Sequence, residues 1–427
     1  MSLHFKSTRG SGPFTFEEAL LSGLAPDGGL FVPEAIPRVE FSDVLSAESF
    51  SELGFRALSF WIGDEVGEDT LRAIVESALD FPVPLVALEG PGWEDVHVLE
   101  LFHGPTLSFK DFGARTMAGL MGHFLERRGE RRTILVATSG DTGSAVADGF
   151  AGQSRIEVVL LYPRGKVSPM QERQLIVDRP GVRVFAVDGD FDDCQRIVKE
   201  AFTDPRLAGR GLSSANSINV GRLLPQMLYY AWAVAQLGGR GPVFCVPSGN
   251  LGNLTAGILA HLSGLVAQYF IAAHNANDFF PRLLMGDDEA SFQSTIPTLS
   301  NAMDVGAPSN FERLDHLLDR ESMRRLIRGA SVTDAETLAS IRRVYEETGY
   351  VADPHTAVGL EAVRRMRRGE AAPVVVLATA HPAKFPETVE EAIGITPEAP
   401  ARLARLWDEP TSFSVIGPRT DELAARV

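Results

Sequence analysis

The sequence is short of several features, and each shortage excludes a class of protein. Only two of its 427 residues are cysteines, Cys194 and Cys245, and they fall in unrelated segments. Neither a disulfide framework nor a cysteine-based metal site is therefore expected. No apolar run approaches the roughly 18 residues that cross a bilayer, and the first residues lack the apolar stretch of a secretory signal. We expect a cytoplasmic protein without a membrane partner.

Positive charge is also scarce. Lysine and arginine number 40 against 56 aspartates and glutamates, which gives a formal net charge of −16. Such a protein repels the phosphates of nucleic acid and of anionic lipid, so we expect neither as a partner. An anionic ligand would need positive groups concentrated locally against the field of the whole protein.

Several familiar motifs are missing as well. The chain has no Walker lysine motif, no dinucleotide fingerprint and no local Ser-His-Asp signature. Its histidines show no metal-ligand spacing, so no metal is expected. The histidines considered are His103, His274, His355 and His381.

The length and the ordinary composition, 44% hydrophobic and 22% charged, allow two or three globular domains. Residues 1–95 are expected to form an N-terminal helical domain, with helices near 16–23 and 64–79. Beyond residue 95 short apolar runs alternate with helical segments, which predicts an α/β fold with doubly wound parallel sheets. The runs are nearly continuous, as in strands buried on both faces. They are 133–137, 156–161, 182–187, 243–246 and 374–378.

Polar clusters occur just after the ends of these predicted strands. In open α/β sheets ligands bind outside the carboxyl ends of the strands, so four such loops could line one crevice. The clusters are 138–143, 163–166, 248–253 and 379–384. The irregular segment 286–312 either covers this crevice or is an insertion, and the sequence leaves both readings open.

Lys110 is a candidate reactive amine, because it lies close to Phe109 and Phe112 in the sequence. A primary amine is nucleophilic only without its proton, and aromatic crowding can lower a pKa that is about 10.4 in water. Taken alone, a lysine next to Asp111 is more often a surface residue beside a partner carboxylate.

The loop 247–255 is a candidate phosphate site. Its glycines let backbone N–H groups close on a phosphate at a helix N-terminus, although such a loop alone is most often only a turn. One lysine for an aldehyde and one cradle for a phosphate together describe a pyridoxal phosphate site.

Three further positions suit an anionic substrate or the cofactor ring. The segment 138–143 opens a helix and suits a carboxylate or phosphate, or serves equally well as an N-cap. Ser217 and Arg222 could hold a phosphate, with the arginine offering its planar fork, or could belong to a capped helix with a solvent-facing arginine. Thr379 could bond the pyridine nitrogen or merely cap the next turn of the chain.

Recognisable motifs run along nearly the whole chain. Near the N-terminus they are 7–10 and 23–34, and in the core they are 103–113, 137–143, 161–166, 216–219, 299–304 and 380–384. These motifs resemble those of the threonine synthases, pyridoxal phosphate enzymes with the fold of the tryptophan synthase β-subunit family, or fold type II. The resemblance implies a region 96–427 of two subdomains, approximately 96–225 and 226–427, with the site in the cleft between them.

The resemblance also implies roles for single residues. Lys110 would bond the cofactor aldehyde as a Schiff base, and Thr379 would meet the ring nitrogen. Asp141 stands where many relatives have an asparagine that contacts the phenolic oxygen, so an aspartate needs a proton or a different role. The cofactor phosphate would be held by Gly249, Asn250, Leu251, Gly252 and Asn253.

The implied reaction converts O-phospho-L-homoserine and water to L-threonine and phosphate, the last step of threonine biosynthesis, by β,γ-elimination and replacement. The protein would act as a monomer or homodimer. Its rivals are another fold-type II lyase, such as a phospholyase or dehydratase, and a non-catalytic binding protein. We expect the substrate to bind Thr138, Ser139, Gly140, Thr142, Ser217 and Arg222.

Overall fold

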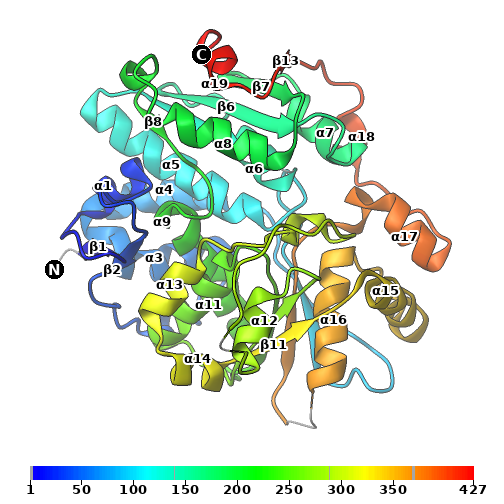
Figure 1. Ribbon diagram of the computed structural model, residues 1–427. Coiled ribbons are helices and arrows are strands. Elements are labelled where there is room, and N and C mark those ends of the chain that lie inside the picture. Colours follow the sequence, from blue (N-terminus) through cyan, green and yellow to red (C-terminus); the bar gives the residue numbers. More distant parts are fainter. Residues whose placement is uncertain (1–2, 139, 288, 368–370) are drawn as a thin grey trace.

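Two parallel sheets organise the computed structural model, which describes residues 3–138, 140–287, 289–367 and 371–427 (Figure 1). The six-stranded sheet has the order β11-β10-β9-β12-β4-β3, and the five-stranded sheet has the order β13-β7-β6-β5-β8. The first contains β3 (Leu85–Ala87), β4 (Val96–Glu100), β9 (Val243–Pro247), β10 (Phe270–His274), β11 (Ile327–Ser331) and β12 (Val374–Ala378). The second contains β5 (Arg132–Ala137), β6 (Ile156–Pro163), β7 (Val182–Val187), β8 (Leu212–Ser213) and β13 (Ser414–Ile416).

Helices cover both faces of each large sheet, which confirms the prediction of a doubly wound α/β fold. On one face of the six-stranded sheet, Val243 and Cys245 pack with apolar residues of α16 (Pro354–Met366). On the other face, Phe244 and Val246 join the main core. The five-stranded sheet alternates in the same way, with Leu135 packed in the core that includes α8 (Phe191–Ala201) and Val136 in the main core.

All pairings in the two large sheets are parallel except β3 with β4. Each of the five predicted apolar runs lies in a strand. Strands β10 and β11 were not among the predicted runs.

The N-terminal part is mainly helical. It contains the antiparallel pair β1 (Phe5–Ser7) and β2 (Phe31–Pro33), together with α1 (Phe16–Ser22), α2 (Phe41–Val44), α3 (Phe50–Val66) and α4 (Glu68–Ala78). A capping box of Thr15 and Glu18 begins α1. The helix expected near 64–79 is two helices, because Gly67 adopts a φ of 84° between α3 and α4.

The remaining helices connect and flank the strands. They are α5 (Lys110–Arg128), α6 (Asp141–Phe150), α7 (Pro169–Ile176), α9 (Val220–Leu223), α10 (Met227–Gln236), α11 (Gly252–Leu262), α12 (Phe279–Leu284), α13 (Phe311–Leu317), α14 (Arg320–Leu326), α15 (Asp334–Thr348), α17 (Pro386–Ile393), α18 (Ala401–Arg405) and α19 (Thr420–Ala424). Short 3-10 turns are η1 (Ala208–Arg210), η2 (Leu224–Gln226), η3 (Asn301–Met303) and η4 (Pro382–Lys384).

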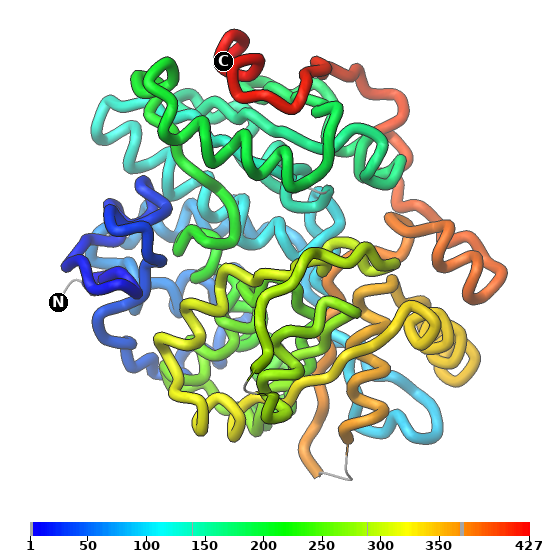
Figure 2. The backbone as a smooth tube through the Cα atoms, in the orientation of Figure 1, coloured from blue at the N-terminus to red at the C-terminus, as the bar shows by residue number. Residues whose placement is uncertain are grey.

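The two large sheets take strands from separate parts of the chain. Strands β3 and β4, which lie on either side of the predicted domain boundary at residue 95, both pair within the six-stranded sheet. Strand β13 returns from the C-terminal end of the chain to pair with β7 (Figure 2). The domain boundaries near residues 95 and 225 stay a prediction.

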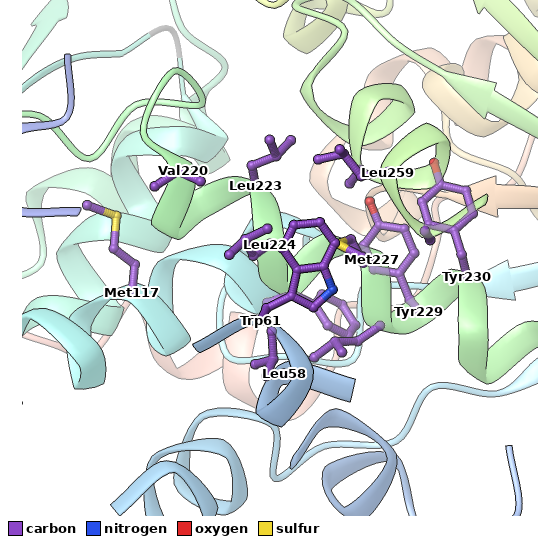
Figure 3. Close-up of a cluster of buried hydrophobic side chains, with 14 of the residues drawn as sticks. Leu58, Trp61, Met117, Val220, Leu223, Leu224, Met227, Tyr229, Tyr230 and Leu259 are labelled. Atoms are coloured by element: carbon purple, nitrogen blue, oxygen red, sulfur yellow. The ribbon is translucent and has the colours of Figure 1, made fainter. Parts of the chain in front are cut away.

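One buried cluster joins the N-terminal helices to the helices that carry the candidate site (Figure 3). It includes Leu58 and Trp61 of α3, Met117 of α5 and Leu259 of α11. From the chain leading into α10 and from α10 itself it includes Val220, Leu223, Leu224, Met227, Tyr229 and Tyr230. Helices α5 and α11, whose first turns lie in the candidate site, are therefore fixed by a shared core.

Candidate active site

Lys110 is the first residue of α5 and lies beside the end of β12. The Phe109 N–H donates to the Thr379 carbonyl at 2.9 Å, and the His381 N–H donates to the Leu107 carbonyl at 3.1 Å. Ser108 and Ala380 form an antiparallel bridge between the same two segments. The fold thus brings together two predicted site residues, Lys110 and Thr379, that are far apart in the sequence.

Only one of the two neighbouring phenylalanines meets the lysine amine. Lys110 Nζ lies 5.3 Å from the centre of the Phe109 ring. Phe112 is fully buried and packs edge-on against Phe50, Phe81 and Tyr229. Both phenylalanines are close to Lys110 in the sequence, but Phe112 lies in the first turn of α5 and points into the main core, away from the amine.

The carboxylate of Asp141 pairs with two lysines. Asp141 begins α6, and its Oδ2 lies 3.7 Å from Lys110 Nζ. Its Oδ1 lies 2.7 Å from the Nζ of Lys384 and accepts a hydrogen bond from Gln171 Nε2 at 3.2 Å. Asp141 therefore has cationic and neutral donors on both sides.

The charges of this cluster are coupled. Burial is the main cause that lowers the pKa of Lys110, with the charge of Asp141 opposing it and those of Lys384 and Arg222 adding to it. Burial alone would raise the pKa of Asp141, but Lys384 and Lys110 outweigh it and hold that pKa well below its usual range. Asp141 is thus a carboxylate that needs no proton here.

The neighbouring Asp111 is held by the loop that precedes it. The Thr106 N–H donates to Asp111 Oδ2 at 2.8 Å, and the Thr106 hydroxyl donates to Oδ1 at 2.5 Å. Burial raises the pKa of Asp111 to about 6 despite these bonds. Asp111 is therefore committed to shaping the loop before Lys110 and is not a surface partner for it.

The predicted phosphate loop runs from the end of β9 into α11 and is shaped by the Asn253 side chain. Asn253 Oδ1 accepts from the Ser248 hydroxyl at 2.7 Å and from the Leu254 N–H at 3.0 Å, and its Nδ2 donates to the Pro247 carbonyl at 2.9 Å. Leu251 has a φ of 61°, and a Cβ on Gly249 would lie 2.7 Å from the Met303 backbone. The loop is therefore tightly constrained.

The same loop leaves a row of backbone donors free. Within the part of the chain that the structure describes, the N–H groups of Gly249, Asn250, Leu251, Gly252 and Asn253 donate to no protein acceptor. No side chain caps the N-terminus of α11. Uncapped N–H groups at a helix N-terminus favour an anion, so the loop fits the phosphate of the predicted cofactor.

Ser217 lies beside this loop, whereas Arg222 is buried close enough to Lys110 for its charge to act on that amine. Asn250 Nδ2 donates to the Ser217 Oγ at 2.7 Å. Arg222 is 3% exposed and donates through Nη1 to the Ala215 carbonyl at 2.7 Å, while its Nε has no partner among the described atoms. Burial lowers the pKa of Arg222 to about 10. The alternative of a solvent-facing arginine is wrong.

The loop before α6 is closed by one of its own hydroxyls. Thr138 Oγ1 accepts from the N–H groups of Gly140, at 3.0 Å, and Gly143, at 2.9 Å, and donates to the Gly140 carbonyl at 3.1 Å. The Thr142 hydroxyl has no hydrogen-bond partner in the described residues. Ser139 lies outside those residues.

Sequence reasoning missed Lys384, Gln171 and Asn310 as members of this region. Lys384 lies in the predicted polar cluster after β12, and that position was the available signal. Gln171 comes shortly after the polar cluster at 163–166, and Asn310 lies in the irregular segment 286–312, one reading of which was a cover over the crevice. The Asn310 side chain donates to the Ser217 carbonyl at 3.4 Å and accepts at 2.6 Å from Arg313, which is fully buried.

The irregular segment 286–312 contacts the site from both sides. Asn301 Nδ2 donates to Gln171 Oε1 at 3.3 Å, and the Ser309 N–H donates to Asn250 Oδ1 at 2.5 Å. Figure 2 shows the stretch near residue 300 crossing between the two halves of the molecule. Residues 301–309 are therefore part of the site's wall.

The described residues contain no cluster of histidine, cysteine, aspartate and glutamate suited to a metal ion. None of the helices in the described ranges combines the length and apolar character needed to cross a bilayer.

Comparison with known proteins agrees with this chemistry. The family model described as "Pyridoxal-phosphate dependent enzyme" matches residues 78–380. Models described as "Threonine synthase N terminus" and "Threonine synthase, C-terminal" match residues 4–79 and 356–427. The chain is 44% identical over 404 residues to the threonine synthase of Escherichia coli strain K12, covering 93% of this chain and 92% of that protein.

Solved structures show the same relationship. The pyridoxal phosphate-bound threonine synthase from Brucella melitensis superposes with a TM-score of 0.94 and 36% identity, covering 100% of this chain and 98% of that chain. The Escherichia coli enzyme gives 0.90 and 41%, covering 99% and 98%. The predicted cofactor, pyridoxal phosphate, is confirmed. Matched along nearly its whole length by sequence and by structure, the chain belongs to the threonine synthase family.

Proposed function

We propose that the protein converts O-phospho-L-homoserine and water to L-threonine and inorganic phosphate. One observation carries the proposal: the amine of Lys110, paired with the Asp141 carboxylate, occurs in one chain with a loop whose five N–H groups have no protein acceptor among the described residues. An amine for an aldehyde and a cradle for a phosphate are what pyridoxal phosphate requires.

Different residues would bind different parts of the cofactor. The N–H groups of residues 249–253 would hold its phosphate, and Lys110 would bond its aldehyde carbon. The Thr379 hydroxyl, which has no other partner among the described residues, would donate to the unprotonated ring nitrogen. When bound, pyridoxal phosphate withdraws electrons from the substrate's amino carbon and so makes the neighbouring C–H bonds acidic.

Lys110 would then act as the proton carrier. Its amine takes a proton at Cα and moves protons at Cβ, while Asp141 Oδ2 stabilises the ammonium that forms. The bond between Cγ and the phosphate oxygen breaks, Cγ gains a proton and becomes the methyl group, and the hydroxyl of water adds at Cβ. Atoms balance with one water consumed and one phosphate released.

Two segments would hold the substrate. The loop with Thr138, Ser139, Gly140 and Thr142 would bind the carboxylate. Ser217 and Arg222 would bind the leaving phosphate, since Ser217 Oγ accepts from Asn250 and keeps its own proton for an anion. The Arg222 Nε is a second donor without a protein acceptor in the described chain.

We also propose a cytoplasmic location and a monomer or homodimer. Cys194 and Cys245 are both free and buried, which fits a reducing compartment.

The test is to incubate the loaded protein with O-phospho-L-homoserine and to assay threonine and phosphate together. Equal amounts of both support the proposal. Phosphate accompanied by a 2-oxo acid in place of threonine would indicate a lyase that does not add water, and no product at all would indicate a binding protein. The control is Lys110→Ala, which should fold as the parent does and retain less than a few per cent of turnover.

A further inference from the structure

The Asp141 carboxylate is shared unequally by the amino groups of two lysines. Lys384 Nζ lies 2.7 Å from Oδ1 and also donates to the Thr106 carbonyl at 3.0 Å. Lys110 Nζ lies 3.7 Å from Oδ2. Lys384 is fully buried and has two acceptors, whereas Lys110 is 13% exposed and makes the longer contact. Lys384 is therefore the fixed cation of the pair, and Lys110 is the loosely held one.

The position of Lys384 links the elements around Lys110. It ends η4 just after β12, and its bond to Thr106 reaches the loop that precedes α5. Gln174 of α7 donates to the same Thr106 carbonyl at 3.1 Å. Lys384 and Gln171 together occupy Oδ1 of Asp141, which leaves Oδ2 for Lys110.

We propose that Lys384 is a positioning residue for Lys110: it fixes the Asp141 carboxylate with Oδ2 toward the Lys110 amine, and its own charge keeps that amine available without a proton. This rests on the proposed function only in taking Lys110 as the reactive amine. The Lys384 ammonium does not touch the reacting atoms: it acts on Lys110 by holding Asp141 and through its own charge.

The charges that face Lys110 decide the direction of the effect. They are Asp141 from α6, Lys384 from η4 and Arg222 from α9, with His355 of α16 acting on Asp141. Removing Lys384 deletes one cation and frees Asp141 to pair with Lys110, and both changes favour the Lys110 ammonium. Removing the Asp141 charge has the opposite effect, and removing both returns the balance toward the original.

The experiment measures the protonation of Lys110 directly in the full-length protein freed of cofactor. Trace acetylation by acetic anhydride, with mass spectrometry of the Lys110 peptide across pH, gives the titration midpoint of the amine. Lys384→Met should raise that midpoint by at least about one pH unit, and Asp141→Asn should lower it. The double variant should return to within about half a unit of the parent, and Lys384→Arg should stay near it.

The matched control is Lys199→Met on α8, an exposed lysine outside the site, which should leave the midpoint unchanged. In the cofactor-loaded variants, the pH at which the visible absorption band changes should also shift in opposite directions for Lys384→Met and Asp141→Asn. A Lys384→Met protein that folds and keeps the parent midpoint overturns the proposal, as does a shift of both single variants in the same direction.

Asp141→Asn leaves two buried ammonium groups without a carboxylate and so risks failing to fold. If Asp141→Asn fails to fold, Lys384→Met and the double variant are sufficient to test the proposal. Adding Asp141→Asn to Lys384→Met must then reverse the upward shift of the Lys110 titration midpoint. The labelling needs neither cofactor nor substrate. A protein that makes no threonine but shows these shifts would refute the proposed reaction and leave the role of Lys384 intact.

Discussion

At the scale of single residues, an arginine that is 3% exposed and keeps its Nε without a protein acceptor in the described chain holds a donor ready for an anion. We expect Arg222→Ala to lower kcat/KM for O-phospho-L-homoserine by at least about tenfold. Charge-assisted bonds are worth about 1.5–3 kcal/mol, and about 1.4 kcal/mol is a factor of ten. Arg222→Lys should recover only part, because an ammonium lacks the planar fork.

Arg222 also holds the Ala215 carbonyl, so the assay needs a control for the fold. L-Serine has no phosphate, and the rate of its slow spectral reaction with the loaded protein should hardly change in Arg222→Ala. Equal losses for serine and the phosphorylated substrate would show that Arg222 supports the loop and that the phosphate binds elsewhere.

Thr379 offers a second test at this scale. A hydroxyl does not favour a protonated pyridine ring as a carboxylate does, and a neutral ring is the weaker electron sink. Thr379→Asp should therefore lower threonine formation and raise abortive transamination, both measured by product analysis. Thr379→Ser keeps the hydroxyl and should remain close to the parent. If Thr379→Asp matches the parent in both assays, the ring nitrogen has another partner.

The sequence indicated Lys110 and Asp141 but not the charge that accompanies them. An isolated aspartate in a glycine-rich loop has no readable partner, which is why the resemblance led to the expectation that Asp141 needs a proton or a different role. Lys384 supplies the missing cation from a segment more than 200 residues away, through a 2.7 Å contact. Such a pair depends on how β12 and α6 are placed in space, which composition and local pattern do not encode.

At the scale of elements, the loop between β9 and α11 depends on the absence of one side chain. A Cβ at Gly249 would lie 2.7 Å from Met303 Cα and carbonyl oxygen, so Gly249→Ala must displace the loop or the segment near residue 303. We expect the cofactor dissociation constant to rise at least about tenfold, as the free N–H groups lose their shared direction. Titration of the visible absorption band measures it.

Gly252→Ala is the matched control. A Cβ at Gly252 would meet Ser217 and Asn310 at 3.4 Å, an ordinary contact, and the residue has a helical conformation. Its affinity for the cofactor should stay within about threefold of the parent, since the N–H group is retained. Similar losses in both variants would mean that the loop tolerates no added atom and that the clash with Met303 is not the cause.

Elements with strong periodicity were predictable, and those fixed by backbone conformation were not. Strands β9 and β12 lie at the predicted residues because their side chains are apolar on both faces. The apolar pattern runs through Gly67 and gave no sign of its φ of 84°, which ends α3 and starts α4. Strand β11 includes Arg328 and Gly329, so its sequence lacks the expected apolar run.

At the scale of the whole molecule, the site depends on segments that cross between its two halves. Residues 301–309 connect Gln171 of α7 with Asn250, which follows the carboxyl end of β9 in the six-stranded sheet. The sequence allows this stretch to be a cover or an insertion, because its irregular pattern identifies no partner. The hydrogen bonds show that this stretch is part of the site's wall. They connect Gln171, which donates to Asp141, to the predicted phosphate loop.

The stability of the whole molecule should also respond to acid through a buried histidine at the end of β10. His274 is 2% exposed at the end of β10, and burial lowers its pKa from 6.5 to about 4. Below about pH 6.5 the His274 imidazole binds a proton in the unfolded chain but not in the folded protein. The free energy of unfolding therefore decreases as the pH falls toward 4. Asp304 works the other way, because burial raises its pKa to about 6 and the folded state is protonated first.

Because these contributions oppose each other between about pH 4 and 6.5, the difference between two variants is the informative quantity. From pH 7 to pH 5, the free energy of unfolding should fall by about 1–2 kcal/mol less in His274→Gln than in the parent protein. Any constant cost of the glutamine cancels in this comparison. Urea unfolding of the cofactor-free proteins at both pH values measures it, with the exposed His316→Gln as the control. If His274→Gln keeps the parent's pH dependence, the imidazole is protonated in the folded state and its burial does not exclude the charge.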